Sequence, residues 1–284
     1  MEALFIGLTV VTSSATVAAI CSLVYRRLTR RNDDFFNDVA GSIFQVVGTL
    51  YAVLLGLIVV DTMNSMTEIM QTIEHEANGI ANVFILSEGL PAKEGKELKL
   101  LSKKYVESVV DEEWAAMRNC SMSKKASATI VKMWDTALAT DSPKQAHMDI
   151  RSKILDQLSE IGNDRRKRLL SSLQKVPTIL WAVLIFGGIS ITIFTFFFGL
   201  SSASAQAAMA AIVAGSVSLN IYLVYLYGYP FSGSFALTPD GFITDRFVFN
   251  MREKRLLDKV DTTTTTINLH KVSDKSGHVD KLEK

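Results

Sequence analysis

Four long apolar stretches interrupt a chain of 284 residues that is otherwise rich in charge. They cover residues 4–25, 39–60, 178–200 and 207–227. About 20 residues of α-helix, rising about 1.5 Å per residue, cross the roughly 30 Å hydrocarbon core of a bilayer. The first stretch follows Glu2 and not a basic segment, which favours a retained helix over a cleaved signal peptide. The pattern therefore predicts four transmembrane helices.

Between the second and third stretches the chain is polar, and its apolar residues recur with the period of an amphipathic helix. Three helices are predicted there, from the apolar positions Leu98, Leu101, Tyr105, Val109 and Trp114, then Ile130, Met133, Trp134, Ala137 and Leu138, then Ile150, Ile154, Leu158 and Ile161. The sequence thus predicts an all-α integral membrane protein in which two transmembrane hairpins, four helices together, bracket a soluble helical domain.

The changes in hydropathy divide the chain into four parts. These are a first transmembrane hairpin over residues 1–63, the soluble helical domain over 64–176, a second transmembrane hairpin over 177–229, and a loop with a mobile polar tail over 230–284. Pro177 suits the first turn of the third span, because the N–H that proline lacks would be unpaired there. Within the last part, residues 242–249 could form a short strand or an amphipathic segment.

Charge matters only locally, because 30 basic and 29 acidic residues leave a net charge of +1. This balance gives no case for a nucleic-acid partner, whose phosphates call for a basic face. The side of the membrane that holds the soluble domain stays open under the positive-inside rule. The arginines after the first span favour an external domain, whereas basic residues before the third span and after the fourth favour a cytoplasmic one.

A basic run precedes the third span and contains Arg165, Arg166 and Arg168. We expect these side chains at the membrane interface, because a basic run beside a membrane pairs with lipid phosphate or with nearby acids. Their predicted role is to orient the helix that enters the span, and not to take part in catalysis.

No catalytic or metal-binding constellation is evident in the sequence. His75, between Glu74 and Glu76, comes nearest to a metal cluster, but consecutive helix positions point in different directions. A solvated helix surface is therefore the expected role of these residues. We expect no cofactor, no metal site and no enzymatic activity.

The second span carries one stripe of small and polar residues at steps of three and four, namely Ser42, Gln45, Thr49, Ala52 and Gly56. An unpaired amide in hydrocarbon costs a few kcal/mol, so we expect the stripe to face protein or water. Two interpretations stay open: close packing between helices, which small residues permit, and the lining of a pore shared by several subunits. Leu54 and Ile58 are expected to face lipid.

The other spans offer further neutral hydrogen-bonding groups, at Thr9, Ser13, Ser218 and Asn220. The interiors of all four stretches lack Asp, Glu, Lys and Arg, which proton and cation relays normally require. An ion-coupled transporter is therefore disfavoured. Neutral donors with apolar constrictions suit a pore that passes anions, provided that several subunits surround the axis.

Several short strings occur in order along the chain. They are Asn37-Asp38-Val39-Ala40-Gly41, Gly48-Thr49-Leu50-Tyr51-Ala52-Val53-Leu54-Leu55, Tyr105 with Glu112-Glu113-Trp114, Arg165-Arg166-Lys167-Arg168-Leu169, Pro177 with Leu180-Trp181, and Pro230-Phe231-Ser232-Gly233. Together they extend over most of residues 37–242, and the ordered set resembles the bestrophin-like domain family, a largely uncharacterised group of mostly bacterial membrane proteins.

The resemblance implies an oligomeric channel that conducts anions, because the family is named for a distant likeness to bestrophins, which are anion channels. The alternative is a non-conducting membrane scaffold or sensor whose helical domain binds a partner. The expected partners are membrane lipid, further copies of the chain and inorganic anions, and the expected location is a bacterial inner (plasma) membrane. No acidic run resembles the calcium clasp of animal bestrophins, and residues 201–206 are uncharged where relatives carry basic residues.

Overall fold

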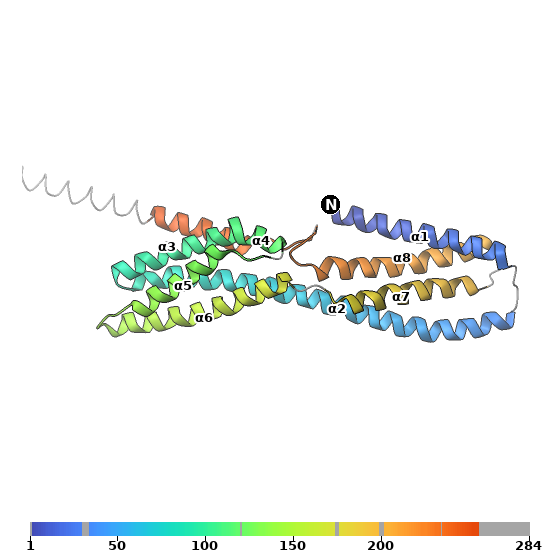
Figure 1. Ribbon diagram of the computed structural model, residues 1–284, viewed down its shortest axis with the longest axis horizontal. Helices are drawn as coiled ribbons and strands as arrows, with labels where there is room; N and C mark the ends of the chain where they lie inside the picture. The colour runs from blue at the N-terminus through green and yellow to red at the C-terminus, as the bar shows by residue number, and fades with distance from the viewer. Residues whose placement is uncertain are drawn as a thin grey trace, which may run out of the picture. The chain divides into compact units, whose positions relative to one another are not determined.

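The structure is a computed structural model that describes residues 2–29, 34–119, 121–173, 176–198, 202–233 and 235–255. These residues are helical apart from short connections, and no strand occurs among them, so the prediction of an all-α protein is confirmed (Figure 1). The chain forms two compact units. We call the first the membrane unit (Met1–Thr72, Met117–Cys120 and Arg166–Thr238) and the second the soluble unit (Ile73–Ala116, Ser121–Arg165 and Pro239–Lys284).

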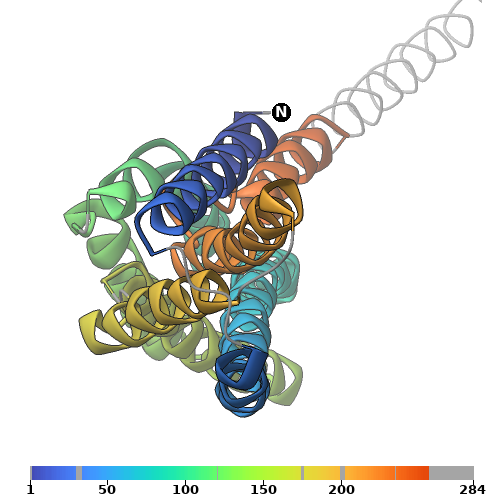
Figure 2. The ribbon, with the colours of Figure 1, turned by 90° about the vertical axis from the view of Figure 1, so that its right-hand side faces the viewer.

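The membrane unit contains four helices that are long and apolar enough to cross a bilayer, as the hydropathy pattern predicts. They are α1 (Glu2–Thr29), the first part of α2 (Asp34–Leu86), α7 (Thr178–Phe194) and α8 (Ala203–Gly228). Figure 2 views these helices end-on and shows α1 beside α8. Because most of their large apolar side chains are exposed on the single chain, these helices need a hydrocarbon environment or other protein around them.

Two pairs of helices form the core of the membrane unit. Tyr222 of α8 covers Gly7 of α1 and donates a hydrogen bond of 2.6 Å to the Ala3 carbonyl oxygen. Tyr51 of α2 similarly donates a bond of 2.7 Å to the Leu184 carbonyl oxygen of α7. A Cβ at Gly7 would lie 2.6 Å from the Tyr222 ring, so glycine at this position permits the close approach of α1 and α8.

The soluble unit is a bundle of helices around one apolar core. It contains the last part of α2, the 3₁₀ turn η1 (Ser87–Gly89), α3 (Ala92–Ser108), the π-helical segment η2 (Val109–Glu113), α5 (Lys124–Ala139) and most of α6 (Gln145–Leu173). The short helix α4 (Trp114–Arg118) follows η2 directly. The residues that predicted three amphipathic helices are largely buried, as Leu98, Tyr105, Met133, Ile154 and Leu158 show. The predicted periodicity is therefore confirmed.

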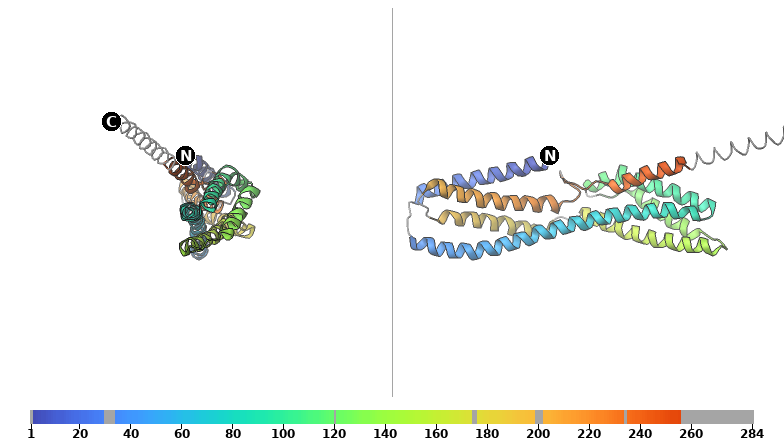
Figure 3. Two further views of the ribbon diagram at one scale, coloured as in Figure 1. Left: turned by 90° about the vertical axis from the view of Figure 1, so that its left-hand side faces the viewer. Right: turned by 180° about the vertical axis from the view of Figure 1, so that it is seen from behind.

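A further helix covers residues 240–255, within the predicted loop and tail and over the segment 242–249 that could form a short strand or an amphipathic segment. The loop and the strand are wrong for 240–255, whereas the amphipathic alternative agrees with the helix, because its two buried phenylalanines lie seven residues apart, which is two helical turns. Phe249 stacks on Phe84 of α2 with ring centroids 4.1 Å apart, and Phe242 packs edge-on against Trp114. Figure 3 shows this helix in orange beside the helices of the soluble unit. Residues 256–284 of the predicted tail lie outside the described residues.

Candidate functional site

The polar stripe of α2 lies on the surface of the single chain. Each of its five members, Ser42, Gln45, Thr49, Ala52 and Gly56, is exposed. A Cβ added at Gly56 would meet no atom within 4 Å, so no described part of the chain packs there. The hydroxyl of Thr49 donates to the Gln45 carbonyl oxygen at 2.7 Å, which satisfies that donor within the helix. The stripe is therefore not used to pack the helices of one protomer.

A different face of α2 makes the contacts with the rest of the protomer. Tyr51, Leu55 and Ile58 are buried in one cluster with residues of α7 and α8. The expectation that Ile58 faces lipid is wrong, because steps of four and three place it on the same face as Tyr51. Leu54 is 38% exposed.

Three faces of α2 can thus be distinguished, roughly a third of a turn apart at about 100° per residue. One face is buried, and one is apolar and exposed, with Leu50 and Leu57 at 67% and 64% exposure. The third is the polar stripe. Since hydrocarbon solvates the apolar exposed face well and the amide of Gln45 poorly, the stripe is the face that requires another protein surface or water.

The secondary polar residues of the spans come from α1 and α8, and most of them satisfy their own hydrogen bonds. Thr9 and Ser13 donate to carbonyl oxygens of the preceding turn of α1, and Asn220 donates to the Ser216 carbonyl oxygen. Ser218 donates to Ser14 across the α1–α8 contact at 2.7 Å. Among the described contacts, none joins these groups to the stripe, and Ser218 serves helix packing.

The basic run before the third span lies mostly inside the protein. Arg168 is fully buried, and its guanidinium contacts the sulfur of Met117 at 2.9 Å. Arg165 donates to Glu113 at 2.6 Å and to Ser127 at 2.9 Å. Arg165 thus pairs with a nearby acid, which is one of the two expected kinds of partner, and Arg166 is exposed. The expected place at the membrane interface is wrong for Arg168, because α6 turns this side chain into the protein.

Two buried carboxylates form the polar interior of the soluble unit. Glu76 accepts a hydrogen bond of 2.6 Å from the hydroxyl of Tyr105, and Glu113 accepts the bond from Arg165. Both glutamates are fully buried, so the expectation of a solvated surface fails for Glu76. Exposed His75 instead contacts Asp164 at 2.5 Å. In the described ranges no three His, Cys, Asp or Glu residues form a group that could hold a metal ion.

Sequence reasoning missed Glu113, and its local backbone explains why. Glu113 ends the π-helical segment η2, in which the helix widens by one residue per turn. A strict 3.6-residue repeat continued from α3 indicates Glu112 and not Glu113 for the buried face, although it is Glu113 that is buried. Segments of this kind are often found at functional sites. Here the segment directs a carboxylate into the core, toward Arg165.

Helix 240–255 is attached to the soluble unit by three ion pairs along its length. Arg246 pairs with Asp111 at 3.1 Å, and Glu253 pairs with Lys103 at 2.5 Å. Arg252 binds both carboxylate oxygens of Glu88 at 2.9 Å. This hydrogen bonding, aided by Lys99, holds the pKa of Glu88 below its ordinary value despite partial burial.

Asp245, on the same helix, has surroundings that raise its pKa instead of lowering it. Asp245 faces α2, and its Oδ2 atom is buried without a hydrogen-bond partner in the described structure. Burial, and secondly the charge of Glu74, raises the pKa of Asp245 from 3.8 to about 7. The two helices approach closely here, since a Cβ at Gly241 would lie 3.0 Å from a Glu74 carboxylate oxygen.

Comparison with known structures identifies the fold. A bacterial bestrophin homologue from Klebsiella pneumoniae, solved as a point mutant, has a TM-score of 0.64 with 12% identity over 88% of this chain and 99% of that one. A second point mutant of a Klebsiella pneumoniae homologue gives 0.60, with 12% identity over 91% and 98%. A third structure, phased with zinc, gives 0.57, with 14% identity over 90% and 97%.

At these identities the likeness concerns the fold alone. No curated protein matches the chain. The Bestrophin-like domain family, however, matches residues 11–242, which include all the described transmembrane segments except the first turns of α1. This match extends over far more than half of the sequence and agrees with the resemblance found in its motifs. The chain therefore belongs to the bestrophin-like domain family.

Proposed function

We propose that the protein is an oligomeric membrane channel that conducts anions, with the polar stripe of α2 facing an axis shared by several copies. The observation that carries the proposal is the exposure of Ser42, Gln45, Thr49, Ala52 and Gly56 on the single chain. The exposed side-chain amide of Gln45 in particular requires protein or water, because lipid solvates it poorly. Further copies around an axis supply both.

The chemistry of the stripe favours an anion over a cation. An amide N–H and hydroxyl groups can replace part of the hydration shell of an anion without a fixed charge. The interiors of the four apolar stretches contain no Asp, Glu, Lys or Arg, so the rings of acids that select cations and the relays of proton-coupled transporters have no counterpart there. Membership of the bestrophin-like family supports the same class of function. We place the protein in the inner membrane of a bacterium, surrounded by lipid.

Cysteine scanning of α2 tests the direction of the stripe. In a background with Cys21→Ser and Cys120→Ser, cysteines at positions 45, 49, 52 and 56 should react with a charged methanethiosulfonate reagent. Cysteines at Leu50 and Leu57 are the matched controls, since both are exposed but face hydrocarbon. Reactivity should therefore follow the stripe and spare the controls.

Recordings from purified protein in planar bilayers test conduction. Gln45→Leu should lower the anion current, because it removes the stripe's only amide group, while Leu50→Gln on the apolar exposed face serves as the control. Uniform protection of the stripe, together with no current from well-folded oligomers, would overturn the proposal. In that case the stripe would be a packing surface, as in a scaffold or sensor, and Gly56→Leu would impair assembly instead.

A further inference from the structure

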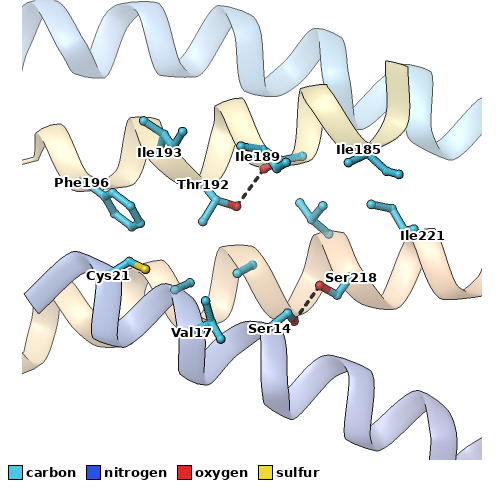
Figure 4. Close-up of a pocket in the computed structure, with 14 residues that line it drawn as sticks. Ser14, Val17, Cys21, Ile185, Ile189, Thr192, Ile193, Phe196, Ser218 and Ile221 are labelled. Carbon is cyan, nitrogen blue, oxygen red and sulfur yellow. Dashed lines mark hydrogen bonds between the residues drawn. The ribbon is translucent and has the colours of Figure 1, made fainter. Parts of the chain in front are cut away.

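A groove of about 340 Å³ lies within the membrane unit, between α1, α7 and α8. Figure 4 shows its walls, which are formed mainly by aliphatic side chains such as Val17, Ile189 and Ile221. Small residues, including Ala18, Gly188 and Ala214, line its floor. The groove therefore presents an apolar surface of concave shape.

The few polar groups in the groove are already satisfied. Ser218 donates to Ser14, and Ser14 donates in turn to the Val11 carbonyl oxygen at 3.0 Å. The hydroxyl of Thr192 donates to the Gly188 carbonyl oxygen at 2.8 Å (Figure 4). An occupant thus finds only the Cys21 thiol, a weak hydrogen-bonding group, free among the lining residues. Hydrocarbon is the chemistry that this lining accepts without loss of a hydrogen bond.

The length of the groove matches one leaflet of a bilayer. The wall formed by α7 and the following 3₁₀ turn η3 (Thr195–Phe197) extends from Ile185 to Phe196. At about 1.5 Å per residue this is about 16 Å, close to half of the roughly 30 Å hydrocarbon core. A helix of this length with a diameter of about 10 Å would occupy about 1,200 Å³, several times the volume of the groove. A single acyl chain is a better fit than a helix from a neighbouring subunit.

One end of the groove has the features of a membrane–water interface. Beyond Cys21 and Phe196, the ring of Tyr25 lies 6.2 Å from the ring of Phe196 and packs edge-on against Phe197. Amphipathic aromatic rings of this kind collect at the level of lipid headgroups. The next two residues of α1 are arginines: Arg26 donates to Gln206 at 3.2 Å, and Arg27 is exposed. Positive charge therefore lies at the level along α1 at which the phosphate of a lipid in this leaflet would be.

We propose that this groove binds one glycerophospholipid, with an acyl chain between α1, α7 and α8 and its phosphate on Arg27. The lipid fills the space above the small residues of the floor and supports the contact of α7 with α8. This site is separate from the stripe of α2, and the proposal does not depend on conduction.

Native mass spectrometry of the full chain in detergent, titrated with dioleoylphosphatidylglycerol, tests the site. Arg27→Gln should weaken binding about fivefold, the equivalent of about 1 kcal/mol for one basic residue at a headgroup, while Arg27→Lys should keep most of the affinity. Val17→Trp places a large ring at the rim of the groove and should abolish the bound lipid. Val10→Trp is the matched control, because it makes the same change on the same helix outside the groove.

Alkylation of Cys21 provides a second measurement that needs no bulky variant. Cys21 is exposed and lines the groove, and Cys120→Ser leaves it as the only thiol. Phosphatidylglycerol should slow its reaction with N-ethylmaleimide in the Arg27 protein and have little effect in Arg27→Gln. Equal lipid binding by Val17→Trp and Val10→Trp would overturn the proposal. So would protection of Cys21 that depends on the oligomer and not on lipid, because the groove would then be a contact between subunits.

Discussion

Replacing Asp245 with asparagine should make the attachment of helix 240–255 independent of pH. The carboxyl of Asp245 has a buried oxygen without a partner and lies near Glu74 of α2. Burial first, and the charge of Glu74 second, raises the pKa from 3.8 to about 7. Asparagine occupies nearly the same volume but carries no charge at any pH, so it removes the titration and leaves the packing.

The size of the effect follows from the shift in pKa. A pKa raised by about 3 corresponds to a free-energy difference of about 4 kcal/mol in favour of the protonated carboxyl over the ionised one in the folded protein. Because the side chain is only half-buried, solvent screening reduces this to about 1–2 kcal/mol. The stability that comes from the protonated form is fully present below pH 3.8 and is lost as the pH rises through about 7. Asp245→Asn should therefore stabilise the helix most at pH 8 and least at pH 4.

Hydrogen exchange of peptides from residues 240–255, measured from pH 5 to pH 8 and corrected for intrinsic exchange, reports this attachment directly. The wild-type helix should lose protection as the pH rises, and the Asp245→Asn helix should keep it. Asp240→Asn is the control, because it makes the same change of charge at an exposed position at the start of the same helix. An unchanged pH dependence in Asp245→Asn would refute the reasoning.

Three further predictions concern packing, and thermal or denaturant unfolding of the purified protein measures each. Arg165→Met should lower the free energy of unfolding by about 1.5–3 kcal/mol, because it removes a charged hydrogen bond to the buried Glu113, and adding Glu113→Leu should recover part of the loss; a double variant no more stable than the single one would contradict this. Gly95→Ala should destabilise, because its Cβ would lie 2.3 Å from a backbone oxygen, whereas Gly162→Ala has open space and should gain up to about 1 kcal/mol of helix propensity. Tyr51→Phe should cost about 1 kcal/mol, because it removes the hydrogen bond that the Leu184 carbonyl oxygen accepts in addition to its helical one, and no loss would show that water replaces the hydroxyl.

Predictions made from short sequence segments were wrong where a residue's environment depends on distant parts of the chain. The basic run of residues 165–168 has the composition of a membrane flank, yet Arg168 is buried against Met117, which is 51 residues away in the sequence. Helix 240–255 follows a Pro- and Gly-rich loop and has few apolar residues, so its weak periodicity gave no clear signal. Its position depends on Phe84 and Trp114, with which its phenylalanines pack.

The sequence by itself determined the four spans, the helical soluble domain and the family. These features follow from local rules, because hydrocarbon requires about 20 apolar residues with internally satisfied backbone groups, and an amphipathic helix repeats every 3.6 residues. Only the tertiary structure decided which face of α2 is buried, and therefore that Ile58 packs inward while Gln45 stays exposed. A helical period can place residues on a common face, but the neighbours that cover a face come from elsewhere in the chain. For the same reason the apolar groove became visible only when α1, α7 and α8 were placed together.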